Sequence, residues 1–227
     1  VGVSDSENFL ASDAMALAGV TDQIVYLEEG DHVDLQLGKY WIEDAQHKPV
    51  NRAVKTVQAH SGAAELGPYR HYMQKEIFEQ PRAIADTLEG IVGITPELFG
   101  DGAYSVFKGV ERVLILACGT SYLSGSVAQY WIEAIAKLPC TVEIASEYRY
   151  RESVPNPNTL IVTITQSGET ADTLAALAME QERRRAMADP AYAPRLLGIT
   201  NRPESSLGRL VDQILDIGAG IEVGVAA

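Results

Sequence analysis

The chain has 227 residues, of which 46% are hydrophobic and 22% charged, and this balance is typical of a globular protein with a sizeable buried core. Its formal net charge of −13 argues against nucleic acid or an anionic membrane surface as a partner. The sequence contains no apolar run of the roughly 20 residues that a membrane-spanning helix needs and no recognisable signal peptide, and since it starts at Val1 rather than Met we expect a piece of a longer protein.

The first 58 residues predict an α+β region that begins with a short helix over 12–17. Antiparallel strands are expected over residues 23–27, 32–37, 39–42 and 50–57. The acidic group Glu28, Glu29 and Asp31 has the residue types of a metal site, but a solvated hairpin turn explains these residues better. No acid–base constellation is recognisable in this region.

Residues 59–110 read as a linker followed by a helical connector. The stretch 59–68 is small, polar and Gly-containing, as linkers are. A helix is expected over 69–79, and Pro81 then opens a second helix that Gly90 ends. His71 lies in the aromatic helix and is interpreted as a packed structural residue.

From residue 111 onward, apolar strands alternate with helical patterns, which predicts a parallel sheet covered by helices on both sides. The expected strands cover residues 112–117, 141–145, 160–164, 195–200 and 213–217. The helix after the first strand carries a stripe that is expected to pack on the sheet, formed by Val127, Tyr130, Trp131, Ala134 and Ile135. The charged run over 180–185 is interpreted as a solvated helix face.

Two of these strands end in loops that combine glycine with hydroxyl side chains and lead directly into a helix. One loop has the sequence Cys-Gly-Thr-Ser at 118–121, and the other has Thr-Gln-Ser-Gly-Glu-Thr at 165–170. Free backbone N–H groups at a helix start attract anions, so phosphate binding is one interpretation, and helix capping by Ser167 or Thr170 is the other. Neither loop has a nucleotide-binding glycine pattern, which favours a small phosphorylated metabolite.

The two cysteines, Cys118 and Cys140, form no disulfide framework, and this favours a reduced, cytoplasmic setting. Neither has partners at metal-ligand spacing. Cys118 lies in the first loop, but no activating His is near it in sequence, so a small residue that shapes the loop is favoured over a nucleophile.

Several segments closely resemble the glutamine–fructose-6-phosphate aminotransferase family. Within its first sugar-isomerase (SIS) domain the matching segments are A-C-G-T-S-Y at 117–122, E-I-A-S-E-Y-R-Y at 143–150 and T-Q-S-G-E-T-A-D-T at 165–173. Outside that domain they are E-N-F-L-A-S-D at 7–13, L-E-E-G-D at 27–31 and Y-R-H-Y-M-Q-K-E-I-F-E-Q-P at 69–81. The matches run nearly end to end and keep the family's order, so the resemblance is specific.

The resemblance implies three regions. Residues 1–58 would be the α+β end of an N-terminal-nucleophile glutaminase domain, 59–110 the connector, and 111–227 a first SIS domain that is incomplete at its C-terminus. This α/β domain would have a flavodoxin-like, five-stranded parallel sheet flanked by helices. By resemblance the residues that bind fructose 6-phosphate are Thr120, Ser121, Thr165, Gln166, Ser167, Thr170 and Val225. Family members often have serine where Thr165 and Ala227 stand, so a hydroxyl contact at Ala227 is not expected.

The activity implied is conversion of fructose 6-phosphate and glutamine into glucosamine 6-phosphate and glutamate, by a homodimer without cofactor or metal. The family's catalytic cysteine is the first residue of the mature chain, whereas Val1 stands first here, and its isomerase residues belong to segments beyond Ala227. No catalytic residue is therefore assigned, and the chain alone is expected to be inactive. Two alternatives stay open: a sugar-phosphate-sensing SIS module, and an SIS deglycase or isomerase without ammonia transfer.

Overall fold

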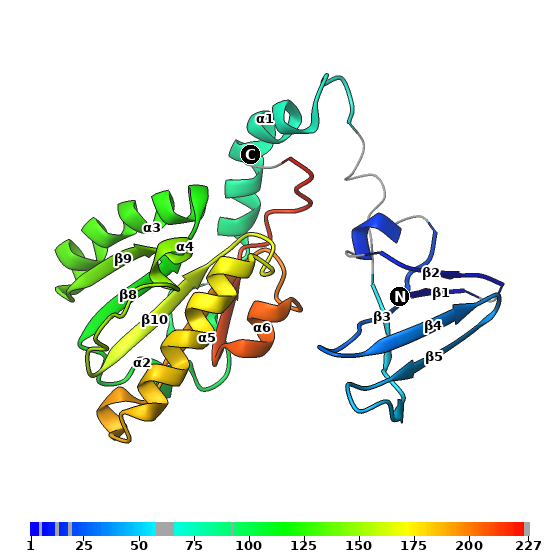
Figure 1. The fold of residues 1–227 in the computed structure, drawn as a ribbon. Helices are drawn as coiled ribbons and strands as arrows, with labels where there is room; N and C mark the ends of the chain where they lie inside the picture. Colours follow the sequence, from blue (N-terminus) through cyan, green and yellow to red (C-terminus); the bar gives the residue numbers. More distant parts are fainter. Residues whose placement is uncertain (5, 12–13, 18–19, 58–65, 92, 225–227) are drawn as a thin grey trace. The chain divides into compact units, whose positions relative to one another are not determined.

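The computed structural model describes the chain except for residues 5, 12–13, 18–19, 58–65, 92 and 225–227. It divides into two compact units, Val1–Lys75 and Glu76–Ala227 (Figure 1). Each unit has its own hydrophobic core. Among the described residues, no helix is both long enough and apolar enough to cross a membrane.

The first unit contains two small antiparallel sheets around a core of Val1, Val25 and Ile42. One sheet has the order β2-β1-β3-β7 and is formed by Asn8–Phe9, Gly2–Val3, Gln23–Val25 and Val54–Thr56. The other has the order β4-β5-β6 and is formed by His32–Gln36, Lys39–Glu43 and Pro49–Val50. A 3-10 helix, η1, covers Ala14–Leu17, and the first two residues of the helix expected there lie outside the described residues.

The single strand expected over 50–57 is wrong, because β6 and β7 are separate strands in different sheets. Between them, Arg52 turns toward the acidic group and donates to Asp31 at 2.8 and 2.9 Å. Glu28 lies 3.0 Å from the same guanidinium. Two of the three carboxylates of the acidic group therefore bind an arginine.

The second unit is built on a five-stranded parallel sheet of order β12-β11-β10-β8-β9. Its strands are β8 Arg112–Ala117, β9 Cys140–Ile144, β10 Thr159–Ile164, β11 Leu196–Thr200 and β12 Gln213–Asp216. All five confirm the predicted strands to within one residue at each end. Long apolar runs are expected of strands that helices cover on both faces.

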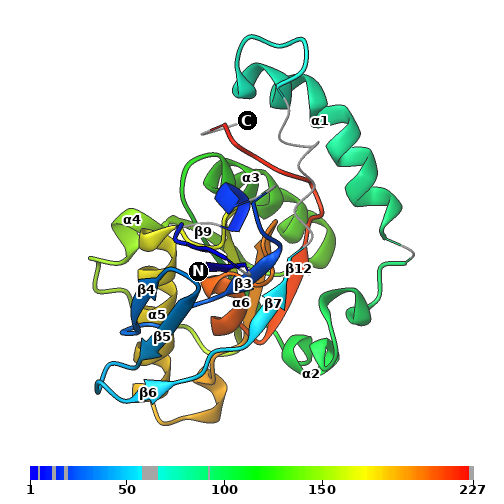
Figure 2. The same ribbon diagram turned by 90° about the vertical axis from the view of Figure 1, so that its right-hand side faces the viewer.

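Helices cover the two faces of this sheet (Figures 1 and 2). Leu114, Leu116 and Ile161 point to the face covered by α4, α5 and α6, whereas Ile115 and Val162 point to the face of α2 and α3. Besides the long helix at its start, described below, the helical segments of the unit are α2 Ala103–Phe107, α3 Gly119–Trp131, α4 Ala145–Tyr148, α5 Ala171–Ala186, α6 Ser206–Leu210, the 3-10 helices η3 Pro96–Phe99 and η5 Pro190–Tyr192, and the π-helix η4 Ile132–Ala136.

The predicted orientation of α3 is wrong. Tyr130, Trp131 and Ile135 are 74%, 64% and 80% exposed, so the stripe of large side chains faces outward. The helix instead packs on the sheet through small or medium residues, including Gly125 and Ala128. A Cβ atom at Gly125 would lie 3.0 Å from Ile115, so the absence of a side chain lets the helix approach the strand closely.

The two helices expected around Pro81 are one continuous helix, α1, over Tyr72–Glu89. Pro81 lacks the N–H that would bond to the carbonyl of Ile77, but none of the residues of α1 is buried, so water can hydrate that carbonyl. The last described residues run alongside this helix (Figure 2), where Glu76 accepts hydrogen bonds from the N–H groups of Val223 and Gly224.

Candidate functional site at the sheet switch point

The strand order places the two hydroxyl-rich loops next to each other. From β8 the chain continues outward to β9, and from β10 it continues in the opposite direction to β11, so the order of the sheet reverses between β8 and β10. These two strands are parallel neighbours and end together, with Ala117 paired to Ile164. Ligands of open α/β sheets bind at the carboxyl ends of the strands on either side of such a switch point.

The β10–α5 loop, residues 165–170, is closed by a pair of hydroxyls. The Oγ1 atoms of Thr165 and Thr170 lie 2.7 Å apart. Ser167 is exposed, and its Oγ accepts a hydrogen bond from the N–H of Glu169 at 3.1 Å. Thr170 precedes α5 but makes no side-chain capping bond within the described chain, so the capping interpretation does not describe this hydroxyl.

What we call the β8–α3 loop, residues 118–121, consists of Cys118 and the first three residues of α3, and it presents hydroxyls that the described chain does not use. Thr120 is exposed and Ser121 half-buried, and neither side chain is hydrogen-bonded to a described residue. Gly119 has φ +57°, a left-handed conformation that glycine adopts without strain. The loop therefore has donors available for a ligand at the start of α3.

Cys118 is half-buried and links the first loop to α5. Its Sγ atom accepts from the hydroxyl of Thr173, the third residue of α5, at 3.7 Å. This contact joins the first loop to the helix that follows the second. The other cysteine, Cys140, is buried, and burial raises the pKa of its thiol to about 11, so it stays protonated at neutral pH.

No lysine or arginine belongs to either loop, and the two nearby carboxylates bind other groups. Asp172, in the first turn of α5, pairs with Arg149 at 2.6 Å. This hydrogen bond raises the pKa of Arg149. Glu169 is exposed and accepts from the N–H of Ser206 at 2.7 Å. An anion between the loops would therefore be bound by N–H groups, hydroxyls and helix dipoles.

Of the residues that the sequence predicted for this site, six lie on the two neighbouring loops. Gln166 is half-buried between Thr165 and Ser167, and its carbonyl accepts from the Thr200 hydroxyl at 3.0 Å. The seventh, Val225, lies outside the described residues, and only the preceding Val223 and Gly224 are placed, by their bonds to Glu76.

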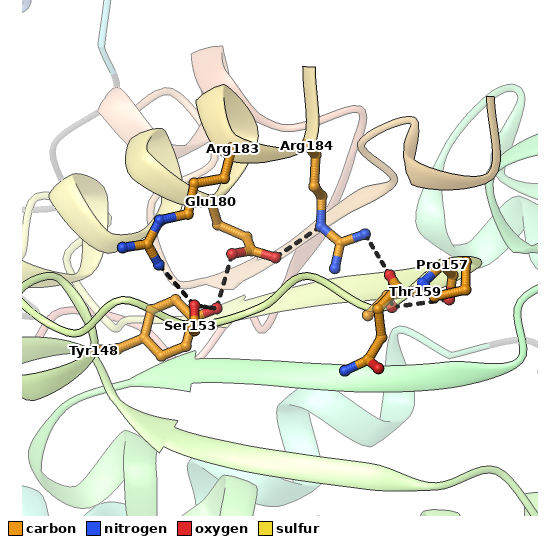
Figure 3. Close-up of polar contacts among 8 residues, drawn as sticks. Tyr148, Ser153, Pro157, Thr159, Glu180, Arg183 and Arg184 are labelled. Carbon is orange, nitrogen blue, oxygen red and sulfur yellow. Dashed lines mark hydrogen bonds and ion pairs between the residues drawn. The ribbon is translucent and has the colours of Figure 1, made fainter. Parts of the chain in front are cut away.

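Sequence reasoning missed a buried polar network on the α5 side of the sheet (Figure 3). Glu180 and Arg184 form an ion pair at 2.8 Å with side chains 0% and 1% exposed, so the prediction of a solvated face is wrong for these two residues. Tyr148 donates to the other oxygen of Glu180 at 2.8 Å and accepts from Ser153. The network lines a pocket with an empty volume of about 410 Å³, including its open mouth. The i, i+4 spacing of Glu180 and Arg184 is the signal that could have revealed it.

A doubly wound parallel sheet with two hydroxyl-rich loops at its switch point is the architecture expected of a sugar-isomerase type of domain. Residues 107–227 match the family model of the SIS domain, and the chain belongs to this family. The predicted SIS fold, with its five-stranded parallel sheet, is thereby confirmed.

Named relatives agree with the resemblance. Glutamine–fructose-6-phosphate aminotransferase [isomerizing] of Bordetella parapertussis is 61% identical over the whole chain, and that of Xylella fastidiosa is 47% identical. The chain spans 36% of the length of each of these relatives. A solved structure, the C-terminal domain of glucosamine-fructose-6-phosphate aminotransferase from Francisella tularensis, is 42% identical with a TM-score of 0.65, over 72% of this chain and 44% of that one.

Proposed function

We propose that the chain is part of a glutamine-dependent fructose-6-phosphate aminotransferase and that this part binds the sugar phosphate. The intact enzyme would make glucosamine 6-phosphate and glutamate from fructose 6-phosphate and glutamine. The observation that carries the proposal is the meeting of two helix starts at the switch point, each with hydroxyl side chains in or just before its first turn and neither with a lysine or arginine there. Relatives that carry this enzyme's name match the whole chain, which supports the same reading.

In this proposal the phosphate lies between the β8–α3 and β10–α5 loops. Ser121, Ser167 and Thr170 donate hydroxyl hydrogens to it, together with backbone N–H groups at the starts of α3 and α5. The remaining proposed contacts come from Thr120 beside the sugar, from Thr165 and Gln166, and from Val225. No residue of this chain is proposed as a catalytic group, so the chain alone should make no product.

The domain boundaries, the location and the oligomeric state belong to the same proposal. Residues 1–58 would be the C-terminal part of a glutaminase domain, and residues 59–110 would connect this domain to the next. Residues 111–227 would form the first SIS domain of a cytoplasmic enzyme. We propose a homodimer because the outward stripe of α3 and η4 includes Trp131 and Ile135, and apolar side chains of this size gathered on one helix face are typical of an interface.

Calorimetry tests the sugar-phosphate site. Fructose 6-phosphate should bind, and fructose should bind at least about a hundredfold more weakly, because charge-assisted hydrogen bonds to phosphate are the strongest contacts that the loops offer. Inorganic phosphate, as a third ligand, shows how much of the binding affinity comes from the phosphate group without the sugar. Equal affinity for fructose and its phosphate would contradict the proposal.

A further inference from the structure

The β10–α5 loop is bonded along its length to a segment that the proposed phosphate contacts do not include. This segment, residues 200–207, covers the end of β11 and the start of α6. The Thr200 hydroxyl and the Asn201 N–H both donate to the carbonyl of Gln166, at 3.0 and 3.1 Å. Two residues on, the N–H of Leu207 donates to the carbonyl of Gly168 at 3.1 Å. The backbone conformation of the loop is therefore stabilised by hydrogen bonds from residues 200–207.

The side chain of Ser205 fills the space under the loop. Gly168 has φ +68°, and a Cβ atom at this position would overlap the Ser205 side chain. The Ser205 hydroxyl oxygen is buried and has no hydrogen-bond partner among the described residues. A buried hydroxyl that forgoes its hydrogen bond is unusual, and here the side chain is packed directly against the glycine of the loop.

Among the hydrogen bonds of the described residues, Glu169 makes the one that joins a side chain of the loop to this segment. Its carboxylate accepts from the N–H of Ser206 at 2.7 Å, the first N–H of α6 and one that has no acceptor inside the helix. A carboxylate within a phosphate-binding loop would repel the ligand if it turned toward the site. Bonded to Ser206 it both avoids that orientation and ties the middle of the loop to α6.

We infer that Glu169 is a positioning residue, which holds the β10–α5 loop in its ligand-binding conformation through the Ser206 N–H. The inference rests on the proposed function for its ligand but not for its geometry. Loss of this bond frees the loop between Gly168 and Thr170, so binding must then order the loop again, and affinity falls. Glutamine keeps an acceptor oxygen at the same place, so Glu169→Gln should preserve the conformation.

Hydrogen exchange of the unliganded chain tests the geometry. In Glu169→Ala the Ser206 amide should exchange about tenfold faster, as expected for loss of a hydrogen bond to a charged group. Glu169→Gln should exchange like the wild type. Glu182→Ala removes an exposed carboxylate from α5 and is the matched control. Unchanged exchange at Ser206 in Glu169→Ala would overturn the inference whether or not the chain binds a sugar phosphate.

Calorimetry with fructose 6-phosphate tests the consequence. Glu169→Ala should bind about tenfold more weakly than the wild type, and Glu169→Gln within about threefold of it. Wild-type affinity in Glu169→Ala, or equal losses in both variants, would overturn the positioning role. A wild-type chain that binds no fructose 6-phosphate would instead contradict the proposed function, and the exchange experiment would still decide the role of Glu169.

Discussion

The hydroxyls of Thr165 and Thr170 lie 2.7 Å apart, at the end of β10 and at the start of α5. Thr165 is buried, so this bond satisfies a polar group that water does not reach. Only one proton can lie in the shared bond, and the other hydroxyl keeps its own proton free to donate. The two residues therefore form one unit that closes the loop and offers a single hydroxyl donor.

Removing hydroxyls from this loop should weaken sugar-phosphate binding. Ser167→Ala and Thr170→Val should each cost roughly 1.5 to 3 kcal/mol of binding free energy, the range for hydrogen bonds to charged groups. Thr165→Val with Thr170→Val should cost less than the sum of the single changes, because the hydroxyls act as a pair. Calorimetry measures the affinity of the single and double variants, and Thr141→Val, at an exposed position on β9, is the control. Unchanged affinity with a stability loss of about 1 kcal/mol in Ser167→Ala would show that this hydroxyl only accepts the Glu169 N–H and does not bind the ligand.

Alanine at Gly168 should be far more costly than alanine at an open glycine. Gly168→Ala combines a left-handed backbone with overlap against Ser205, and overpacking of this kind costs about 1 to 3 kcal/mol. Gly218 also has positive φ but has nothing within 4 Å of its Cβ position, so Gly218→Ala measures the backbone strain alone. The stability that Gly168→Ala loses beyond the loss in Gly218→Ala is the cost of the overlap. Urea unfolding should show that adding Ser205→Gly to Gly168→Ala recovers much of this additional loss. No recovery in the double variant would refute the overlap.

Breaking the buried ion pair should destabilise the second unit strongly. Arg184→Met leaves the carboxylate of Glu180 buried without its cation, which costs about 3 to 5 kcal/mol. Glu180→Leu together with Arg184→Met should recover most of this loss, because both charges are then gone. Arg185→Met, at an exposed position next in sequence, should stay within about 0.5 kcal/mol of wild type. Denaturant unfolding measures all three, and a double variant less stable than Arg184→Met would contradict the explanation.

A charge on the outward face of α3 should weaken self-association. Trp131 is 64% exposed on this helix, and Trp131→Glu would place a carboxylate within the proposed interface. Sedimentation should show a dimer for the wild type and at least about tenfold weaker association for the variant. The control is Arg185→Glu, at an exposed position on α5. A monomeric wild-type chain would count against this surface as a dimer interface.

Acid should weaken the first unit through Asp31. Hydrogen bonds from Arg52 lower the pKa of Asp31 to about 2, well below its ordinary range. Folding thus favours the ionised carboxylate, and the stability it contributes is present above pH ~4 and lost as pH falls from about 4 to 2. The stability difference between wild type and Asp31→Asn, from urea midpoints, should shrink over that range. A constant difference would be the contrary result, and Asp34→Asn on β4 is the control.

Local sequence was sufficient for the sheet of the second unit and for the loops at its site. The strands around Val113 and Leu160 are continuous apolar runs, which are typical of a sheet covered on both faces. The order glycine, hydroxyl, helix start is also local, so the sequence alone indicates residues 118–121 and 165–170 as candidates for phosphate binding, with helix capping as the alternative.

Tertiary structure decided which residues of each helix were covered. Periodicity places Trp131 and Ile135 on one face of α3 and η4, but the face that packs on the sheet is the one with Gly125, because close approach needs a small residue. From the sequence, Glu180 and Arg184 are interpreted as solvated charges. In the fold both are buried, because Tyr148 donates a hydrogen bond to Glu180 and the carbonyl of Asn156 accepts one from Arg184. A side chain's burial depends on partners that are distant in sequence, so local pattern defines the faces of a helix and only packing selects the buried one.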